Sequence, residues 1–505
     1  MTAEYFDVVI VGAGLSGIGA ARHLQDKCPN KSYVILEGRD AMGGTWDLFR
    51  YPGIRSDSDM FTLGYKFKPW LESKAIADGP SILKYVEETA AERGVDRHIR
   101  YRHLVKGADW SSDDASWTVK AERRDTGEAV RIRCGYILMC AGYYSYEQGY
   151  TPEFTGRNSF GGQIIHPQKW PEDLDYEGKK VVVIGSGATA VTLVPEMAKK
   201  AEHVVMLQRS PTYMVSLPAV DIIANFLQKI LPSKMAYDIT RWKNIRFQQA
   251  VYRQTRTNPE KVKQKILHML RKQLPPDYDV ETHFTPHYNP WDQRLCLVPD
   301  NDFFLSVKSG DASIVTDTID TFTEKGVLLE SGRELEADII ITATGLNLVI
   351  LGGAEFSVDG KHVNFPDTFS YMGMMYSDVP NIITTFGYIN ASWTLRADVT
   401  AEFTCRLLNH MDEAGYRQCT PRLRPEDKDM PAKQWITDFS SGYMQRVMHL
   451  FPKQGDKAPW LNTQNYTEDK KIIENREIDD GVLQFSNPAE GSGSVDSDHL
   501  ESDAA

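Results

Sequence analysis

The sequence has 505 residues, a length that corresponds to about three domains of ordinary size. Its 41% hydrophobic and 25% charged residues are typical of a globular protein and argue against a disordered, collagen-like or coiled-coil chain. The formal net charge of -12, from 57 Lys+Arg and 69 Asp+Glu, argues against nucleic acid as the main partner.

Cysteine usage and hydropathy predict the cellular compartment. The 6 cysteines form no C-x-x-C pair, so we expect a reducing compartment and neither a zinc site nor a thiol-redox centre. No stretch reaches the roughly 18 apolar residues of a membrane span. The N-terminus lacks the basic region and cleavage site of a signal peptide. We therefore expect a cytoplasmic protein with no metal site.

The chain begins with a predicted βαβ unit that carries a glycine motif. The hydrophobic run 8–11 leads into Gly12-Ala-Gly14-Leu-Ser-Gly17 and then into a predicted helix. Glycines at this spacing permit a tight turn and let the backbone approach a pyrophosphate at the helix N-terminus. Glu37 ends the next predicted strand, where a carboxylate accepts hydrogen bonds from ribose hydroxyls. A site with an acid at this place suits FAD.

A second predicted βαβ unit begins at residue 179. Its strand, 181–184, leads into the run Gly185-Ser186-Gly187-Ala188-Thr189-Ala190, in which Ala190 replaces the third glycine. The next strand, 203–208, ends in Arg209 and Ser210, where the first unit has its acid. A base at this place attracts a 2′-phosphate, which indicates NADP rather than NAD. The alternative is that Arg209 is a solvated side chain at a strand end.

Together these patterns predict an α/β protein with two Rossmann-like dinucleotide-binding domains, for FAD and NADPH, and a helical insertion. We expect the FAD domain in two segments, 1–145 and 337–486, with the NADPH domain, 146–336, between them. The predicted strand in 337–345 would return the chain to the FAD domain. The tail, 487–505, has five acidic residues and no Lys or Arg, and we expect it to be disordered. Chains with two dinucleotides are reductases or monooxygenases, and disulfide reductases would need a cysteine pair near the flavin.

The helical insertion is expected over residues 219–290. This segment has 12 Lys+Arg against 6 Asp+Glu, and its apolar residues recur at helical spacing. One interpretation is a solvated helical face above a substrate tunnel. The other is peripheral contact with an anionic membrane, which would help an enzyme that acts on lipophilic substrates.

Two longer patterns resemble a known family. Residues 160–171 match the F-x-G-x-x-x-H-x-x-x-W-P fingerprint of type I Baeyer–Villiger monooxygenases at every fixed position, including His166 and Trp170. Residues 43–57 match the second signature of that family. Within it, the runs 44–65, 288–299 and 390–395 resemble the ethionamide-activating branch. The resemblance extends from about residue 7 to about residue 485.

This resemblance implies an FAD- and NADPH-dependent monooxygenase that inserts one oxygen atom from O2 into ketones to give esters or lactones. Sulfoxidation would be a side activity. The partners would be molecular oxygen and a small lipophilic ketone or sulfide. Two alternatives stay open: a flavin monooxygenase that hydroxylates heteroatoms or long alkyl chains, and a non-oxygenating NADPH-binding flavoprotein that serves as a reductase or redox sensor.

The resemblance also implies roles for individual residues. Arg294 would be the catalytic arginine, because a permanently charged guanidinium stabilises a developing oxyanion, and Asp57 would orient it. His166 would couple domain motion; the alternative is a buried, hydrogen-bonded histidine. Gln293 stands where many members have a lysine that reaches the 2′-phosphate, which leaves NADP selectivity to Arg209 and Ser210. The expected FAD contacts are Gly12, Gly14, Ser16, Gly17, Glu37, Gly44, Thr45, Trp46, Asp57 and Val105, and the expected NADP contacts are Arg55, Ser56, the run from Gly185 to Ala190, and Val191.

Overall fold

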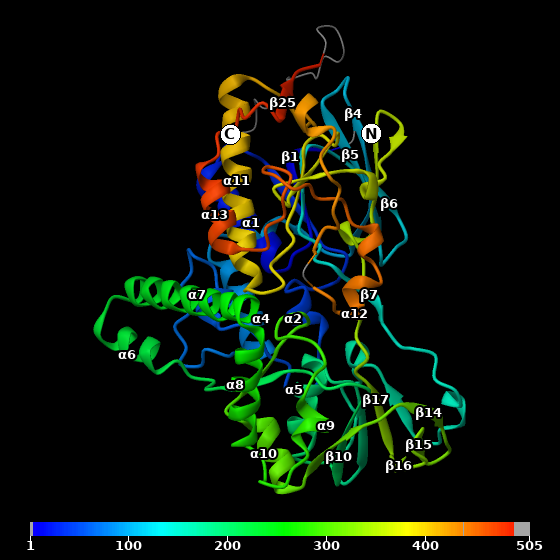
Figure 1. The fold of residues 1–505 in the computed structure, drawn as a ribbon. Coiled ribbons are helices and arrows are strands. Elements are labelled where there is room, and N and C mark those ends of the chain that lie inside the picture. The colour runs from blue at the N-terminus through cyan, green and yellow to red at the C-terminus, as the bar shows by residue number, and fades with distance from the viewer. Residues whose placement is uncertain (1–3, 438, 489–505) are drawn as a thin grey trace, which may run out of the picture.

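Two sheets and a projecting pair of helices organise the molecule (Figure 1). The computed structural model describes residues 4–437 and 439–488. In Figure 1 the sheet that contains β1 lies above the sheet that contains β10, and α6 and α7 project at one side. Of the expected disordered tail, only residues 487 and 488 fall within the described residues, and the rest lies outside them.

The upper sheet is built around the first predicted βαβ unit. Strand β1 (Glu4–Val11) pairs in parallel with β2 (Tyr33–Leu36), and helix α1 (Leu15–Lys27) connects them. Val8 to Val11 are buried, as expected of a strand covered on both faces. The other strands of this sheet are β3 (Ile99–Arg100), β4 (His103–Ser111), β5 (Ser116–Arg123), β6 (Ala129–Met139), β19 (Glu355–Val358), β20 (Lys361–His362) and β23 (Ile382–Thr384).

The lower sheet has five strands, all parallel, in the order β13-β10-β9-β17-β8. Helix α5 (Ala188–Met197) follows β9, and helix α10 (Asp302–Ser309) precedes β13. A small antiparallel sheet of β14 (Ile319–Phe322), β15 (Gly326–Leu329) and β16 (Glu334–Glu336) lies beside it. The strands of the parallel sheet are β8 (Gln163–Ile165), β9 (Lys180–Ile184), β10 (His203–Gln208), β13 (Ala312–Thr316) and β17 (Ile339–Thr342).

One expectation about the domain boundary was wrong. The strand in 337–345 was expected to return the chain to the FAD domain, but β17 pairs with β8 and β9 in the lower sheet. Its run of isoleucines is fully buried. A strand of this kind could form its backbone hydrogen bonds in the centre of either sheet. The hydrophobic pattern alone therefore does not distinguish the two sheets. The chain returns to the upper sheet only after Gly345.

The two sheets are connected by a narrow antiparallel ribbon of β7 (Tyr144–Gly149) and β18 (Leu346–Leu348). Leu346 lies opposite Gly149, so the chain leaves and re-enters the upper half at one place. A side chain at Gly149 would collide with the ring of His166, because a Cβ there would lie 1.9 Å from Cε1 of that ring. The ribbon and His166 are therefore packed closely together.

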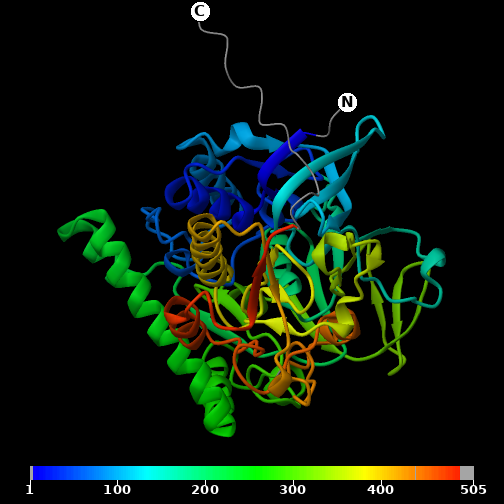
Figure 2. The ribbon, with the colours of Figure 1, turned by 90° about the horizontal axis from the view of Figure 1, so that it is seen from above.

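The helical insertion consists of four helices between β11 (Met214–Leu217) and β12 (Cys296–Pro299). Figures 1 and 2 show α7 along one side of the molecule, with the end that carries α6 projecting beyond the rest of the chain. We call α6 and α7 together the arm. The four helices are α6 (Ile222–Ile230), α7 (Ser233–Thr257), α8 (Pro259–Arg271) and α9 (Val280–Phe284).

The last part of the chain packs against the first. Helix α11 (Trp393–Ala414) lies against α1, and their buried side chains share one hydrophobic cluster that includes Ile18, Leu24 and Leu407. Strands β24 (Gln418–Pro421) and β25 (Leu483–Ser486) then close this end as an antiparallel pair. The remaining helices named below are α3 (Met60–Leu63), α12 (Gly442–Gln445) and α13 (Tyr466–Asn475).

Candidate active site

A cavity of about 570 Å³ lies between the two halves of the molecule. Its wall contains the glycine turn that follows β1, the loop before α3, the first turn of α5 and the segment before β12. Segments far apart in the sequence therefore meet at one place. The predicted site residues that line the cavity are Gly12, Gly14, Ser16, Glu37, Gly44, Thr45, Trp46, Arg55, Ser56, Asp57, Val105, Ala188, Thr189 and Arg294.

The first glycine turn leaves room for a phosphate at the start of α1. Gly12 has φ +102°, and a Cβ there would lie 2.7 Å from the carbonyl oxygen of Cys140. Gly14 is the N-cap of α1, and no side chain caps the free N–H groups of this helix. Gly17 does not line the cavity; a Cβ there would lie 1.9 Å from the Gly12 carbonyl oxygen, so its role is close packing beneath the turn. These features fit a dinucleotide pyrophosphate.

Glu37 is held rigidly in the cavity wall. Its Oε2 accepts a hydrogen bond from the N–H of Ala13 at 2.8 Å, and its Oε1 accepts one from the N–H of Arg39 at 2.9 Å. Burial raises the pKa of Glu37, although the two backbone donors counteract this effect. The carboxylate is thus tied to the glycine turn, where an acceptor for ribose hydroxyls is expected.

The second glycine turn lies at the edge of the cavity. Gly185 has φ +136°, and a Cβ there would lie 2.3 Å from the carbonyl oxygen of Ala343. Ser186 Oγ donates a hydrogen bond to the carbonyl oxygen of Ser210 at 3.0 Å, which ties the turn to the end of β10. Arg209 is exposed and has no ion pair within the described residues. The predicted residues outside the cavity lining, besides Gly17, are Gly185, Ser186, Gly187, Ala190, Val191, Arg209 and Ser210.

Arg294 and Asp57 face the same cavity but do not touch. No hydrogen bond or ion pair joins them in the part of the chain that the structure describes. Burial raises the pKa of Asp57, and the positive charges of Arg294 and Arg55 only partly oppose it. Burial also disfavours the charge of Arg294, but the electrostatic influence of Tyr443, Tyr143, Asp57 and Tyr144 together outweighs it and holds the pKa of Arg294 above its ordinary value. Arg294 therefore stays charged.

Arg55 is engaged in an ion pair between the two halves. Its guanidinium contacts the carboxylate of Asp302, the first residue of α10. The sequence analysis predicted Arg55 as an NADP contact. In the structure it lies in the cavity wall and bridges to the lower half of the molecule.

Several cavity residues were missed by the sequence analysis. Trp393, the first residue of α11, donates from Nε1 to Ser16 Oγ at 2.7 Å and stacks against Tyr143, with ring centroids 5.3 Å apart. The hydroxyls of Tyr143 and Tyr144 lie 3.1 Å apart in the same wall. Trp393 belongs to the run 390–395, and the family resemblance of this run was the feature of the sequence that could have indicated it as a site residue. The aromatic-rich start of the connector was the signal for the tyrosines, but neither signal indicates that the side chains converge.

His166 lies beside the connecting ribbon and does not line the cavity. Its Nδ1 accepts a hydrogen bond from the N–H of Gln168 at 3.2 Å, so its Nε2 carries the proton and donates to the carbonyl oxygen of Gly345 at 3.1 Å. Burial lowers the pKa of His166, which favours this neutral form. The side chain thus links the connector to the ribbon strand that follows Gly345.

The structure presents neither a metal centre nor a membrane-spanning helix within the residues that it describes. Within residues 4–437 and 439–488, no group of three or more His, Cys, Asp and Glu side chains is arranged to hold a metal ion. No helix in this part of the chain combines the length and hydropathy that a membrane span requires.

Comparisons with known proteins agree with this architecture. Residues 74–278 match the family model described as flavin-binding monooxygenase-like, and residues 10–69 match an NAD(P)-binding Rossmann-like domain. The FAD-containing monooxygenase EthA of Mycolicibacterium smegmatis is 54% identical over 485 residues, which cover 96% of this chain and 97% of that protein.

Two solved structures share the fold at low sequence identity. An oxidised steroid monooxygenase bound to NADP has a TM-score of 0.76 and 21% identity, and a cyclohexanone monooxygenase in an open form has a TM-score of 0.75 and 20% identity. Each match covers 96% of this chain and 100% of the other. This likeness extends across both sheets and the insertion between them.

Proposed function

The chain belongs to the family of FAD-containing monooxygenases, and on this premise we propose that it inserts one oxygen atom from O2 into ketones to give esters or lactones. Sulfoxidation is the side activity. Its cofactors are FAD and NADPH. The fingerprint at residues 160–171 supports this reaction, as does the likeness to a steroid and a cyclohexanone monooxygenase. The substrate is a small lipophilic ketone or sulfide.

The residues of the cavity support the binding of FAD. The turn at Gly12 and Gly14 presents the uncapped N-terminus of α1 to the pyrophosphate, and Glu37 offers carboxylate oxygens to the ribose. Ser16 is held in place by Trp393. When bound, FAD supplies the redox chemistry and the activation of oxygen. The turn at Gly185 and the exposed base Arg209 support NADPH at the cavity edge.

The observation that carries the proposal is a charged guanidinium, that of Arg294, whose donors are not engaged by the described residues around the cavity. Its side chain faces the cavity with no hydrogen bond or ion pair within the described residues, whereas Arg55 in the same wall is paired with Asp302. Asp57 in the same wall interacts with this charge electrostatically but does not accept a hydrogen bond from it, so the donors of Arg294 can meet an anion that forms during the reaction. Its charge is available to the carbonyl oxygen of a substrate, on which negative charge develops when the carbonyl is attacked.

The hydroxyls of Tyr143 and Tyr144 support the sulfoxidation activity. They lie beside Arg294 and can donate hydrogen bonds toward a reacting oxygen, and proton donors favour oxygen transfer to an electron-rich sulfur.

Product analysis under labelled oxygen tests the proposal. The holoenzyme is supplied with NADPH, ¹⁸O2 and, separately, linear ketones, aryl ketones and sulfides, and each product is identified by mass spectrometry. We expect esters that carry one labelled oxygen atom, and labelled sulfoxides at a lower rate. Sulfoxides or hydroxylated products alone would favour the heteroatom or alkyl oxygenase. NADPH oxidation with no labelled organic product from any substrate would favour the reductase.

A further inference from the structure

The arm exposes an unusual amount of apolar surface. Nine of the 17 large hydrophobic side chains that are exposed in the described chain belong to α6 and α7, and Trp242 is 65% exposed. Figure 1 shows both helices projecting from the body. The nine are Ile222, Ile223, Phe226 and Ile230 on α6, and Met235, Ile239, Trp242, Phe247 and Val251 on α7.

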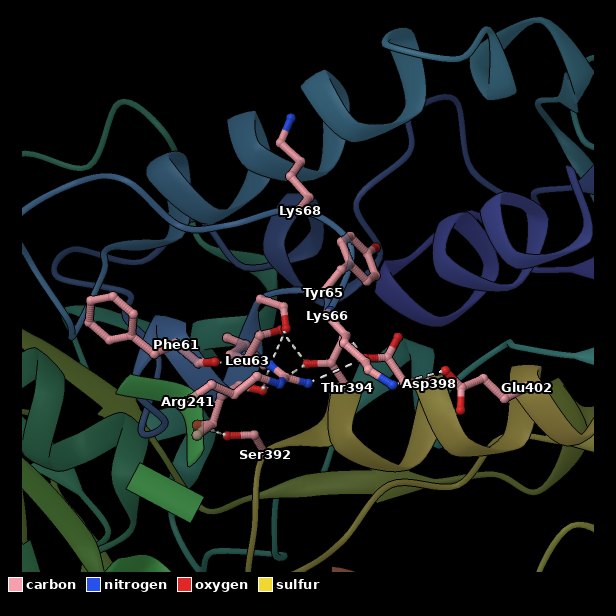
Figure 3. Close-up of polar contacts among 12 residues, drawn as sticks. Phe61, Leu63, Tyr65, Lys66, Lys68, Arg241, Ser392, Thr394, Asp398 and Glu402 are labelled. Atoms are coloured by element: carbon pink, nitrogen blue, oxygen red, sulfur yellow. Dashed lines mark hydrogen bonds and ion pairs between the residues drawn. The ribbon is translucent and has the colours of Figure 1, made fainter. Parts of the chain in front are cut away.

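The opposite side of α7 is fixed to the body by polar contacts (Figure 3). The guanidinium of Arg241 donates to the carbonyl oxygens of Phe61 and Gly64 at 2.9 and 2.7 Å, and to Asp398 Oδ2 at 3.2 Å. Arg241 is only 6% exposed. Asn244, on the next turn, donates to Asp59 Oδ1 at 2.9 Å. The inward face thus combines these polar contacts with the buried ring of Tyr237, while the outward face keeps large apolar side chains exposed to solvent.

The outward face also carries unpaired positive charge. Met235, Ile239, Trp242, Arg246 and Arg253 follow one another at intervals of four, three, four and seven residues, which places them along one stripe of α7. Within the described residues, neither arginine of the stripe has an ion pair, and both are exposed.

The other charges of the arm are mostly compensated. Lys229 on α6 is exposed and also lacks an ion pair in the described part of the chain. The acidic residue of the arm, Asp238, is already paired with Lys234, and Asp221, the N-cap residue before α6, is paired with Lys243 at 2.6 Å. The free charge of the arm is therefore positive, in a chain whose net charge is -12.

We propose that the arm docks on the surface of an anionic lipid membrane. Exposed Trp, Phe and Ile side chains next to Arg and Lys match the interface of a bilayer, where apolar groups enter the acyl boundary and bases meet lipid phosphates. A second copy of this chain fits less well. A symmetric contact between two arms would bring their unpaired bases together with no free acid to receive them.

Vesicle flotation of the full-length holoenzyme tests this inference, which does not depend on the reaction catalysed. We expect binding to vesicles of phosphatidylcholine with phosphatidylglycerol, little binding to phosphatidylcholine alone, and weaker binding as salt rises. Each base near an anionic surface contributes about fivefold to the partition coefficient. Arg246→Gln with Arg253→Gln should therefore weaken binding by about 25-fold.

Matched variants separate the arm from the rest of the surface. Phe226→Ala with Trp242→Ala should also lose vesicle binding, whereas Leu305→Ala and Lys361→Gln, exposed side chains outside the arm, should keep it. All substitutions are at exposed positions, so the melting temperatures should match the wild type. Trp242 emission should shift to the blue on vesicles, a shift that Trp242→Phe removes.

Three results would overturn the inference. The first is the absence of binding to anionic vesicles. The second is binding that the arm variants retain. The third is that the wild type forms a concentration-dependent dimer but does not bind vesicles, and that the arm variants are monomeric. This outcome would assign the apolar face to contact with a second copy of the chain.

Discussion

At the scale of single residues, Arg294 separates oxygenation from cofactor reduction. Within the described residues no hydrogen bond or ion pair engages its guanidinium, so its loss removes stabilisation of a developing oxyanion and leaves both glycine turns intact. We expect Arg294→Ala to lower the rate of ester formation by about 10²–10³-fold. NADPH oxidation should continue and release hydrogen peroxide instead of ester. Ester yield per NADPH, with peroxide measured in parallel, checks this.

The lysine variant is the control for charge alone. Arg294→Lys keeps the positive charge but loses the planar donor fork, so its ester yield should be low but above that of the alanine variant. If Arg294→Ala makes ester at wild-type yield per NADPH, the charge has no part in the reaction and Arg294 is a structural residue.

Arg209 is predicted to select NADPH over NADH. It is exposed at the end of β10 and has no ion pair within the described residues. A side chain that binds the 2′-phosphate is expected to be free in this way before the dinucleotide binds. Because a charge-assisted contact contributes roughly 1.5–3 kcal/mol, Arg209→Ala should reduce the ratio of kcat/KM for NADPH over NADH by about ten- to a hundredfold, through KM for NADPH. Steady-state kinetics with both dinucleotides checks this. Lys199→Ala, an exposed base elsewhere on the lower half, is the control, and an equal ratio in both variants would contradict the assignment.

The sequence located the tight glycine turns because their backbone requirement is local. Gly12, Gly17 and Gly185 were found because positive φ or a close backbone approach excludes a side chain, and this shows in a motif of a few residues. The pairing of Arg55 with Asp302 joins residues 247 positions apart, and no local pattern encodes it. Trp393 was missed for the same reason, since its hydrogen bond to Ser16 spans 377 positions.

At the scale of elements, the ribbon of β7 and β18 is where pH should act. His166 is neutral there, since Nδ1 accepts from Gln168 and Nε2 donates to Gly345. Because burial lowers the pKa of His166, the unfolded chain binds a proton more readily than the folded one. Its contribution to stability is complete above the ordinary pKa of histidine and is lost as pH falls through that value.

His166→Gln should therefore flatten the pH dependence of stability. The variant should melt below the wild type at about pH 8, and the further loss on going to about pH 5.5 should be smaller than in the wild type. Melting temperatures over a pH series check this, with His362→Gln, at an exposed position on β20, as control. A slope equal to the wild type would remove His166 from the pH response.

The case of β17 shows why the sequence predicted which segments form strands better than it predicted the sheet to which each strand belongs. The periodicity and burial of a central strand are the same in both sheets, so the run of isoleucines was recognised as a strand but placed in the wrong sheet. Its position is decided by long-range pairing with β8 and β9. The helices of the insertion were predicted because their spacing is a local property.

At the scale of the whole molecule, Arg241 joins three parts of the chain. It reaches from α7 to the carbonyl groups at the end of α3 and to Asp398 on α11. Phe61 is 180 positions away from Arg241 in the sequence, and Asp398 is 157 positions away. Asp398 in turn lies 3.2 Å from His23 Nε2 on α1. Figure 3 shows the guanidinium of Arg241 between the backbone near Phe61 and the side chain of Asp398. Arg241 thereby joins the arm, the end of α3 and helix α11.

Arg241→Met should consequently destabilise the holoenzyme far more than an exposed substitution does. The variant removes the guanidinium from the Asp398 carboxylate, which keeps His23 Nε2 and the Lys66 N–H as partners, and it removes the donor to the carbonyl oxygens of Phe61 and Gly64. Breaking a buried ion pair in this way costs about 3–5 kcal/mol. The melting temperature of the variant should fall by several degrees in thermal unfolding.

Arg271→Met is the matched control, since its partner Glu281 is exposed and such pairs contribute about 1 kcal/mol or less. Arg241→Lys should lie between the two variants, because an ammonium keeps the charge but cannot reach all the acceptors at once. Equal melting temperatures for Arg241→Met and Arg271→Met would mean that apolar packing alone holds the arm to the body.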